Sequence, residues 1–303
     1  MAAKVIHFDY EFSPVGQKTK LVLKAAGIPF ERCDQPALLP RPSLEALDIT
    51  YRRIPLLAIG KDIYCDSELV IKVALEQLGK LPTSLADKAF KEWGDNVFSD
   101  VCLLIPAEVL TPEFNKDRGA VNFMSIQRPD LKSARPSSLA QFQGRLKQIE
   151  EHFFLSGGPF INGANISLAD IEAVWPVRWA FKYLGVDKDA GVGKDKFPRV
   201  WKWIESMPDV TAPEISAEDT HASIRGAQYT AKEIGIAKDD PTGLQAGTRV
   251  NVESFDTKAG AYPQAGKLVG LSDEEIVLEL KDGVRLHFPR VGYLVRDANA
   301  VVD

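Results

Sequence analysis

Three different spacings of apolar residues follow one another along this chain of 303 residues, and this succession constrains the fold more than any other feature. In residues 1–80, short apolar runs alternate with segments of helical spacing. From about residue 85 to 234, apolar residues recur every three or four positions, as one face of a helix requires. After a polar stretch (235–247), they recur every second position, as in strands. Because the spacing changes twice, we predict three domains: 1–80, 85–234 and 247–303.

The first domain is predicted to be a compact α/β unit. Lys4–Asp9 is typical of a strand, and Ser13, which is followed by proline, opens a helix. The apolar runs on either side of the turn Gly60–Asp62 predict a hairpin, and a second helix begins at Asp66. The resulting order is strand, helix, strand, followed by two strands and a helix.

The second domain is predicted to be entirely helical, and the third to be a small SH3-like β-barrel. In the second domain, Ser167 and Asp170 have the spacing of a capping box, which starts a helix that is apolar on nearly all sides. In the third, apolar pairs such as Val250 and Val252 are separated by turns such as Lys281–Gly283. The predicted fold class is α/β plus all-α, with an additional β-rich domain.

The charge balance and the cysteines exclude several classes of function. The chain has 37 Lys and Arg against 42 Asp and Glu, a net charge of −5, so it lacks the positive field that holds nucleic acid or an anionic membrane. Its three cysteines, Cys33, Cys65 and Cys102, do not have the spacing of a zinc knuckle, and we expect them to be buried and unreactive. Neither a signal-peptide pattern nor a bilayer-spanning apolar run is found. We predict a cytoplasmic protein without a metal, nucleic-acid or membrane partner.

Three short motifs in the first domain offer chemistry. The hydroxyl of Ser13 lies where the free N–H groups of a helix N-terminus converge, so it either caps the helix or contacts a ligand. Ile54 offers its backbone N–H and C=O to an extended peptide if its bond to Pro55 is cis. Asp66 and Ser67 either cap a second helix or bind an ammonium and a carboxylate group.

Together and in this order, the motifs resemble those of the cytosolic glutathione transferases, in which a thioredoxin-like domain precedes an all-helical domain. The resemblance covers about residues 4–210 and includes Phe197, followed by proline, ahead of Trp203. The segment that begins at Ser13 is most similar to omega-type and fungal serine-type members. Omega members carry cysteine at this position, so the serine points away from thiol–disulfide chemistry.

The resemblance implies a role for each motif. Ser13 would donate a hydrogen bond to the glutathione sulfur. The Ile54 backbone would pair with the cysteinyl unit, with Pro55 in the cis form. Asp66 and Ser67 would hold the ammonium and the carboxylate of the γ-glutamyl end.

The two remaining parts of the expected site are an anchor for the glycine end of glutathione and a pocket for the second substrate. Arg41 stands where omega members place a lysine for the glycine end, and Arg52 and Arg53 are further candidates. The second-substrate pocket is expected between the first two domains. The aromatic residues that could line this pocket are Tyr10, Phe12, Trp93, Phe98 and Trp179.

The function that this resemblance predicts is a glutathione-dependent transferase, with glutathione as co-substrate and a hydrophobic electrophile or an activated ether as acceptor. Family members form dimers, so a homodimer is expected. Two alternatives stay open. One is a non-catalytic binding or scaffold protein that keeps the fold, which the additional β-rich domain favours. The other is a glutathione-dependent isomerase or peroxidase that uses the same thiolate.

Overall fold

The computed structural model describes residues 3–119 and 124–300, so residues 1–2 and 301–303 of the predicted first and third domains lie outside the described residues. The elements of the first part are, in chain order, β1 (Val5–Asp9), α1 (Pro14–Ala25), β2 (Glu31–Asp34), α2 (Pro42–Glu45), β3 (Leu56–Ile59), β4 (Asp62–Cys65) and α3 (Ser67–Gln77). β1 pairs in parallel with β2 and antiparallel with β3, which pairs antiparallel with β4. This is the thioredoxin-like arrangement that the sequence predicts.

The strand directions bring the starts of two helices to one edge of this sheet. β1 and β4 both run antiparallel to β3 and therefore run in the same direction. α1 follows β1 and α3 follows β4, so both helices begin at the same edge. Leu23 of α1 and Val70 of α3 are buried together with Leu57 of β3, which fixes both helices against the sheet.

The part of the chain that follows is helical, as predicted. Its helices are α4 (Asp87–Cys102), α5 (Pro112–Arg118), α6 (Leu131–His152), α7 (Leu168–Tyr183), α8 (Pro198–Glu205) and α9 (Ala217–Gly226), with short 3-10 turns at Met124–Gln127 and Val186–Lys188. The capping box that starts α7 is confirmed, because the N–H of Ser167 donates to Asp170 Oδ2 at 2.9 Å. Asp170 Oδ1 also accepts the indole N–H of the buried Trp203 at 2.9 Å. This buried carboxylate therefore ties the start of α7 to α8.

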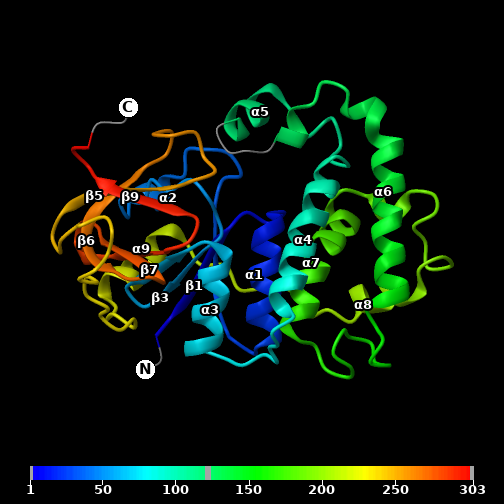
Figure 1. Ribbon diagram of the computed structural model, residues 1–303, viewed down its shortest axis with the longest axis horizontal. Coiled ribbons are helices and arrows are strands. Elements are labelled where there is room, and N and C mark those ends of the chain that lie inside the picture. Colours follow the sequence, from blue (N-terminus) through cyan, green and yellow to red (C-terminus); the bar gives the residue numbers. More distant parts are fainter. Residues whose placement is uncertain (1–2, 120–123, 301–303) are drawn as a thin grey trace.

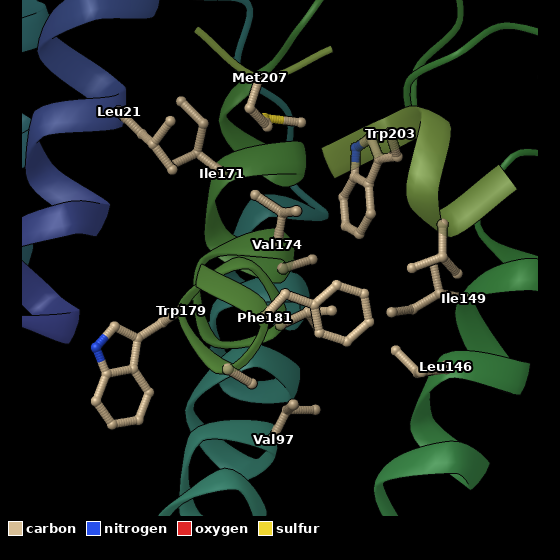
Figure 2. Close-up of a cluster of buried hydrophobic side chains, with 14 of the residues drawn as sticks. Leu21, Val97, Leu146, Ile149, Ile171, Val174, Trp179, Phe181, Trp203 and Met207 are labelled. Carbon is tan, nitrogen blue, oxygen red and sulfur yellow. The ribbon is translucent and has the colours of Figure 1, made fainter. Parts of the chain in front are cut away.

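A single apolar core joins the helical part to the first part of the chain. Leu21 of α1 lies against Ile171 of α7, while Val174 and Phe181 of α7 face α6 (Figure 2). Figure 1 shows α1 between the strands and helices α4, α7 and α6. The start of α1 therefore lies where the two parts meet.

The closed SH3-like barrel predicted at the end of the chain is not confirmed. The strands of this region are β5 (Arg249–Ser254), β6 (Gln264–Leu271), β7 (Glu275–Glu279), β8 (Arg285–Pro289) and β9 (Tyr293–Asp297), with a 3-10 turn at Lys281–Gly283. They continue the first sheet in the order β2-β1-β3-β4-β8-β7-β6-β5-β9, with β8 parallel to β4. The alternating pattern predicted the strands correctly, but it carries no information about which edge they join. Pairing with β8 gives the edge of β4 hydrogen-bond partners that it otherwise lacks.

The C-terminal strands also share a core with the first part of the chain. Phe8 of β1 and Leu56 of β3 belong to the same buried cluster as Leu268 of β6 and Phe288 of β8. The predicted division into separate first and third domains stays a prediction. One buried cluster contains residues of both regions.

A buried histidine lies at the junction of β4 and β8. His287 Nε2 is 3.0 Å from Asp62 Oδ1, and Nδ1 contacts Glu275. Burial lowers the pKa of His287, but the two carboxylates outweigh this effect and the net shift is upward. Burial raises the pKa of Asp62, whereas its bonds to His287, Ala231 and Thr230 lower it by more. We refer to His287, Asp62 and Glu275 as the junction triad.

Candidate functional site

Ser13 ends the loop between β1 and α1, and its side chain caps α1. Its Oγ accepts a hydrogen bond from the N–H of Gly16 at 3.1 Å, and its N–H donates to the carbonyl of Tyr10 at 2.9 Å. The side chain is buried, yet it lines a cavity. Among the described residues the hydroxyl hydrogen has no acceptor. The hydroxyl can therefore cap the helix and donate to a ligand at the same time.

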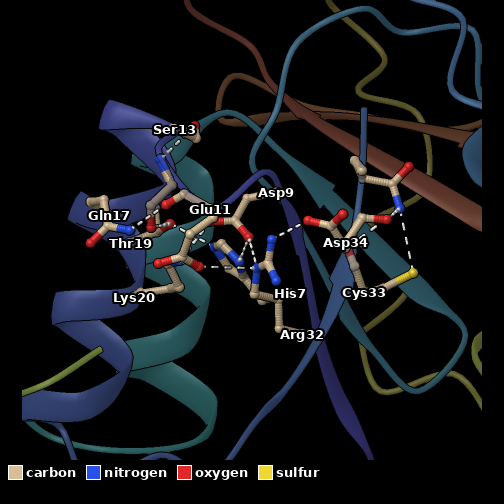
Figure 3. Close-up of polar contacts among 12 residues, drawn as sticks. His7, Asp9, Glu11, Ser13, Gln17, Thr19, Lys20, Arg32, Cys33 and Asp34 are labelled. Atoms are coloured by element: carbon tan, nitrogen blue, oxygen red, sulfur yellow. Dashed lines mark hydrogen bonds and ion pairs between the residues drawn. The ribbon is translucent and has the colours of Figure 1, made fainter. Parts of the chain in front are cut away.

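A buried charge cluster stands behind this loop. Lys20 Nζ is 2.9 Å from Asp9 Oδ2, and Arg32 Nε donates to Asp9 Oδ1 at 2.8 Å. His7 Nδ1 lies 3.7 Å from the same Oδ1 (Figure 3). Burial raises the pKa of Asp9, but His7 and Lys20 lower it by more, to about 2. We call Asp9, His7, Lys20 and Arg32 the Asp9 cluster; it connects β1, α1 and β2 and so fixes the loop that carries Ser13.

Gly16 allows α1 to approach this cluster. A Cβ atom at position 16 would lie 2.5 Å from Asp9 Oδ2 and 3.0 Å from Ser13 Cβ. The first distance is shorter than real Cβ contacts and the second is at the lower limit, so a larger residue would displace the buried Asp9 side chain. The spacing Ser13 to Gly16 is thus a packing requirement of the site.

Ile54 presents an unpaired backbone to the same cavity. The Ile54–Pro55 peptide bond is cis, and β3 begins only after it, at Leu56. Within residues 3–119 and 124–300, neither the N–H nor the C=O of Ile54 forms a hydrogen bond. Ile54 lines the cavity, so its unpaired backbone is available to an extended peptide bound there.

Asp66 and Ser67 lie at the start of α3. Asp66 has φ of 70°, in the left-handed region that residues other than glycine rarely adopt. Its Oδ1 accepts the N–H of Glu68 at 2.9 Å, and its Oδ2 accepts the hydroxyl of Tyr293 at 3.0 Å. The hydroxyl of Ser67 has no partner in the described part of the chain. The helix start therefore keeps a free donor for an anion beside a fixed carboxylate.

Three buried arginines gather near one carboxylate. Arg41 donates to the carbonyl of Arg52, and both Arg52 and Arg118 pair with Asp117. Burial lowers the pKa of Arg41 to about 10, and the neighbouring Arg52 adds to this shift. We call Arg41, Arg52 and Arg118 the arginine cluster. Asp117 is the one carboxylate in the described ranges that pairs with it, so the cluster carries excess positive charge.

These groups surround one cavity of about 260 Å³. All six residues that the sequence suggested for catalysis and glutathione binding line it, namely Ser13, Arg41, Ile54, Pro55, Asp66 and Ser67. Sequence reasoning missed Arg118 and Asp256 as lining residues and Tyr293 as the partner of Asp66. All three come from parts of the chain far away in sequence, and no local pattern distinguishes them.

A second cavity of about 370 Å³ adjoins the first and is mainly apolar. It lies between the β1–α1 loop and helices α4, α5 and α7, and it shares Tyr10, Pro14, Phe98 and Arg118 with the first cavity. Four of the five aromatic residues suggested for the substrate pocket line it: Tyr10, Phe12, Phe98 and Trp179. Trp93 does not, because its ring packs against Phe153 inside the helical part. Helical spacing placed Trp93 on an apolar face of α4 but could not distinguish the core from the cavity.

The three cysteines are buried, as expected. Burial raises the pKa of Cys65 well above its usual value and that of Cys102 to about 12. Within the described residues there is no group of three or more His, Cys, Asp or Glu side chains arranged to hold a metal ion. None of the helices in those residues is both long and apolar enough to cross a bilayer.

Comparison with known proteins agrees with this geometry. Residues 8–82 match the glutathione S-transferase N-terminal domain family, and residues 100–214 match a domain of unknown function, DUF7962. Glutathione S-transferases U1 and U4 of Arabidopsis thaliana are 22% and 23% identical to this chain, over 66% and 65% of it and 82% and 81% of their own lengths. The crystal structure of a GST-like protein from Pseudomonas syringae covers 97% of this chain and 99% of its own with a TM-score of 0.66, at 22% identity. The fold, including the C-terminal strands, therefore occurs elsewhere.

A thioredoxin-like unit followed by helices, with a polar cavity at the starts of α1 and α3, defines the class of glutathione transferase folds. The sequence matches agree: residues 8–82 match the glutathione S-transferase N-terminal domain, and about two-thirds of the chain is similar to plant glutathione S-transferases. Its similarity to omega-type and fungal serine-type members stays a prediction.

Proposed function

We propose that this protein is a glutathione-dependent transferase that joins the glutathione sulfur to a hydrophobic electrophile or uses it to cleave an activated ether. One observation carries the proposal. Ser13 keeps a free hydroxyl hydrogen at the start of α1, inside a cavity that also holds the unpaired Ile54 backbone and the Asp66–Ser67 helix start.

The residues present fit glutathione. The arginine cluster suits the carboxylate of the glycine end, and the Ile54 backbone suits the cysteinyl amide. Asp66 and the Ser67 hydroxyl suit the ammonium and carboxylate of the γ-glutamyl end. When bound, glutathione supplies the thiol that acts as nucleophile.

The role of Ser13 is to favour the thiolate. A thiol of pKa near 8.5 must be lowered by about two units to be largely ionised at pH 7, which requires about 2.7 kcal/mol. A hydrogen bond donated to a charged group contributes about 1.5–3 kcal/mol, and a helix N-terminus about 0.3–1 kcal/mol. The Ser13 hydroxyl and the start of α1 are together sufficient, and serine itself forms no covalent bond.

The adjoining apolar cavity is the proposed binding site for the second substrate. Trp179 closes one wall, and its indole N–H donates to the carbonyl of Phe12 at 2.9 Å. That bond connects α7 to the loop that carries Ser13. An apolar acceptor bound there would lie beside the proposed position of the sulfur.

The test combines calorimetry, the ultraviolet absorbance of the bound thiolate and turnover of a panel of aryl halides and activated ethers. Ser13→Ala should bind glutathione within about twofold of wild type but lose the thiolate absorbance and about 25-fold in turnover at pH 7, because the thiolate fraction falls by about that factor when the pKa rises from about 6.5 to about 8.5. Ser67→Ala should bind far more weakly. The matched control is Ser99→Ala, which removes an exposed serine of α4 that lines neither cavity.

Two results would contradict the proposal in different ways. If wild type binds glutathione but turns over no electrophile, the protein is a binding module and the catalytic part is wrong. If Ser13→Ala keeps both thiolate absorbance and turnover, another group activates the sulfur. The expected homodimer is a separate proposal that rests on the family resemblance, and light scattering tests it.

A further inference from the structure

We propose that Asp256, in the loop after β5, binds the γ-glutamyl ammonium of glutathione together with Asp66, and that Tyr293 positions Asp66 for this task. The inference rests on the proposed function and deepens it. It assigns to the C-terminal strands a part of the glutathione site that the resemblance, which ends near residue 210, does not include.

The first observation is the place of Asp256. It lines the same cavity as Ser13, Asp66 and Ser67, although it lies far along the chain from all of them. Its side chain is 38% exposed, so it has access both to the cavity and to solvent. The C-terminal segment therefore forms part of the cavity wall as well as extending the sheet.

The second observation is how the Asp256 carboxylate is held. Its Oδ1 accepts a hydrogen bond from Arg53 at 2.6 Å and another from the Ser254 hydroxyl. Burial raises the pKa of Asp256, but these two bonds lower it by more, so the group is ionised at neutral pH. Among the described residues, Oδ2 has no hydrogen-bond partner. A fixed carboxylate thus keeps one oxygen for a ligand.

The third observation is a chain of hydroxyls that reaches Asp66. The hydroxyls of Tyr51 and Tyr293 are 2.6 Å apart, and Tyr293 donates to Asp66 Oδ2 at 3.0 Å. Burial raises the pKa of both tyrosines well above the usual value, so both stay protonated. Tyr51 can donate to Tyr293, which donates to Asp66. Because Tyr293 begins β9, the C-terminal sheet fixes the orientation of this carboxylate.

The charges of these lining residues suit a ligand end that carries both a positive and a negative group. Asp66 and Asp256 are negative and Arg53 is positive, which leaves one net negative charge among these three lining residues, and the arginine cluster adds positive charge to the same cavity. The γ-glutamyl end carries an ammonium and a carboxylate on one carbon. The two aspartates fit the ammonium, and the start of α3 at Ser67 fits the carboxylate.

The test uses two ligands that differ only in the ammonium: glutathione and glutaryl-cysteinylglycine, the same tripeptide without its α-amino group. Calorimetry of the full chain measures both. Asp256→Asn should weaken glutathione about tenfold and leave the analogue within about twofold, because one charged hydrogen bond is lost only for the ammonium. Tyr293→Phe should weaken glutathione about threefold with the same selectivity. Asp256→Glu should retain most of the preference for glutathione.

The control is Glu274→Gln. Glu274 lies on the same C-terminal segment as Asp256 but outside the cavity, and its exposed carboxylate pairs with Lys72 of α3. It should change neither affinity. If Asp256→Asn weakens both ligands equally, Asp256 acts only by holding Arg53, and the inference is wrong. It is equally wrong if Asp256→Asn changes neither affinity. Wild-type protein that binds neither ligand would contradict the proposed function itself.

Discussion

The Asp9 cluster and the arginine cluster are both buried, but they differ in how their charges are partnered. In the Asp9 cluster, Lys20 and Arg32 both contact the Asp9 carboxylate, and Arg32 also pairs with Glu214 at 2.6 Å. In the arginine cluster, Arg52 and Arg118 share Asp117, the Arg41 guanidinium bonds to backbone carbonyls, and all three line a cavity. A partnered cluster holds elements together, whereas an excess of one charge beside a cavity is suited to a ligand of the opposite charge. Burial alone therefore does not distinguish a structural charge cluster from a binding one; the number of oppositely charged partners does.

The largest effect is expected for Asp9→Asn. Removing this carboxylate leaves Lys20 and Arg32 without it in a buried site, so the free energy of unfolding should fall by about 3–5 kcal/mol. Denaturant unfolding measures the change, and sulfate should not restore the loss because Asp9 lines neither cavity. An unchanged unfolding midpoint would contradict the structural role of the cluster.

A smaller loss, about 2–3 kcal/mol, is expected for Asp117→Asn, because Arg52 and Arg118 then lack their shared carboxylate. In contrast to Asp9→Asn, added sulfate should recover much of this loss, since an anion can enter the cavity. Thermal unfolding at increasing sulfate, with sodium chloride at matched ionic strength as control, provides the comparison. Equal responses of the two variants would remove the distinction between the clusters.

Arg41→Met should affect binding more than stability. The variant should lose about tenfold in glutathione affinity, or about 1.4 kcal/mol, because the glycine carboxylate loses a charged donor. Relief of the repulsion between Arg41 and Arg52 offsets part of the loss of its two bonds to backbone carbonyls. Calorimetry and denaturant unfolding of the same sample give both values. A large loss of stability with unchanged affinity would mean that Arg41 belongs with the structural cluster.

The smallest effect is expected at the junction triad, where the charge balance depends on pH. The pKa of His287 is raised in the folded state, so its contribution to stability is complete below its usual pKa of 6.5 and is lost as pH rises through the folded value. The pKa of Asp62 is lowered, so its contribution is present above 3.8 and is lost as pH falls through its folded value. The midpoint of urea unfolding should therefore decline above pH 6.5 in wild type. His287→Gln should be less stable, and its urea midpoint should not decline above pH 6.5. If the decline persists in this variant, another group causes it.

Local sequence signals predicted the parts of the fold and the site that local interactions determine. The capping box at Ser167 depends on residues three positions apart, and the positions of Ser13 and Asp66 depend on the helices that follow them. The union of β8 with β4 and the arrival of Asp256 at the cavity depend on tertiary pairing, which a single sequence does not encode in its spacing. The wrong placement of Trp93 in the substrate pocket has the same cause, because periodicity identifies an apolar face of a helix but not what packs against it.

The parallel pairing of β8 with β4 has a consequence for how the chain folds during its synthesis. A strand near the end of the polypeptide completes a sheet that starts at Val5, so the N-terminal portion leaves the ribosome with an unpaired edge and with Phe8 and Leu56 lacking their final cover. Nascent chains that stop before residue 285 lack β8 altogether and expose a surface prone to self-association. Until β8 is synthesised, the free edge of β4 is therefore a point at which the partly folded chain can aggregate.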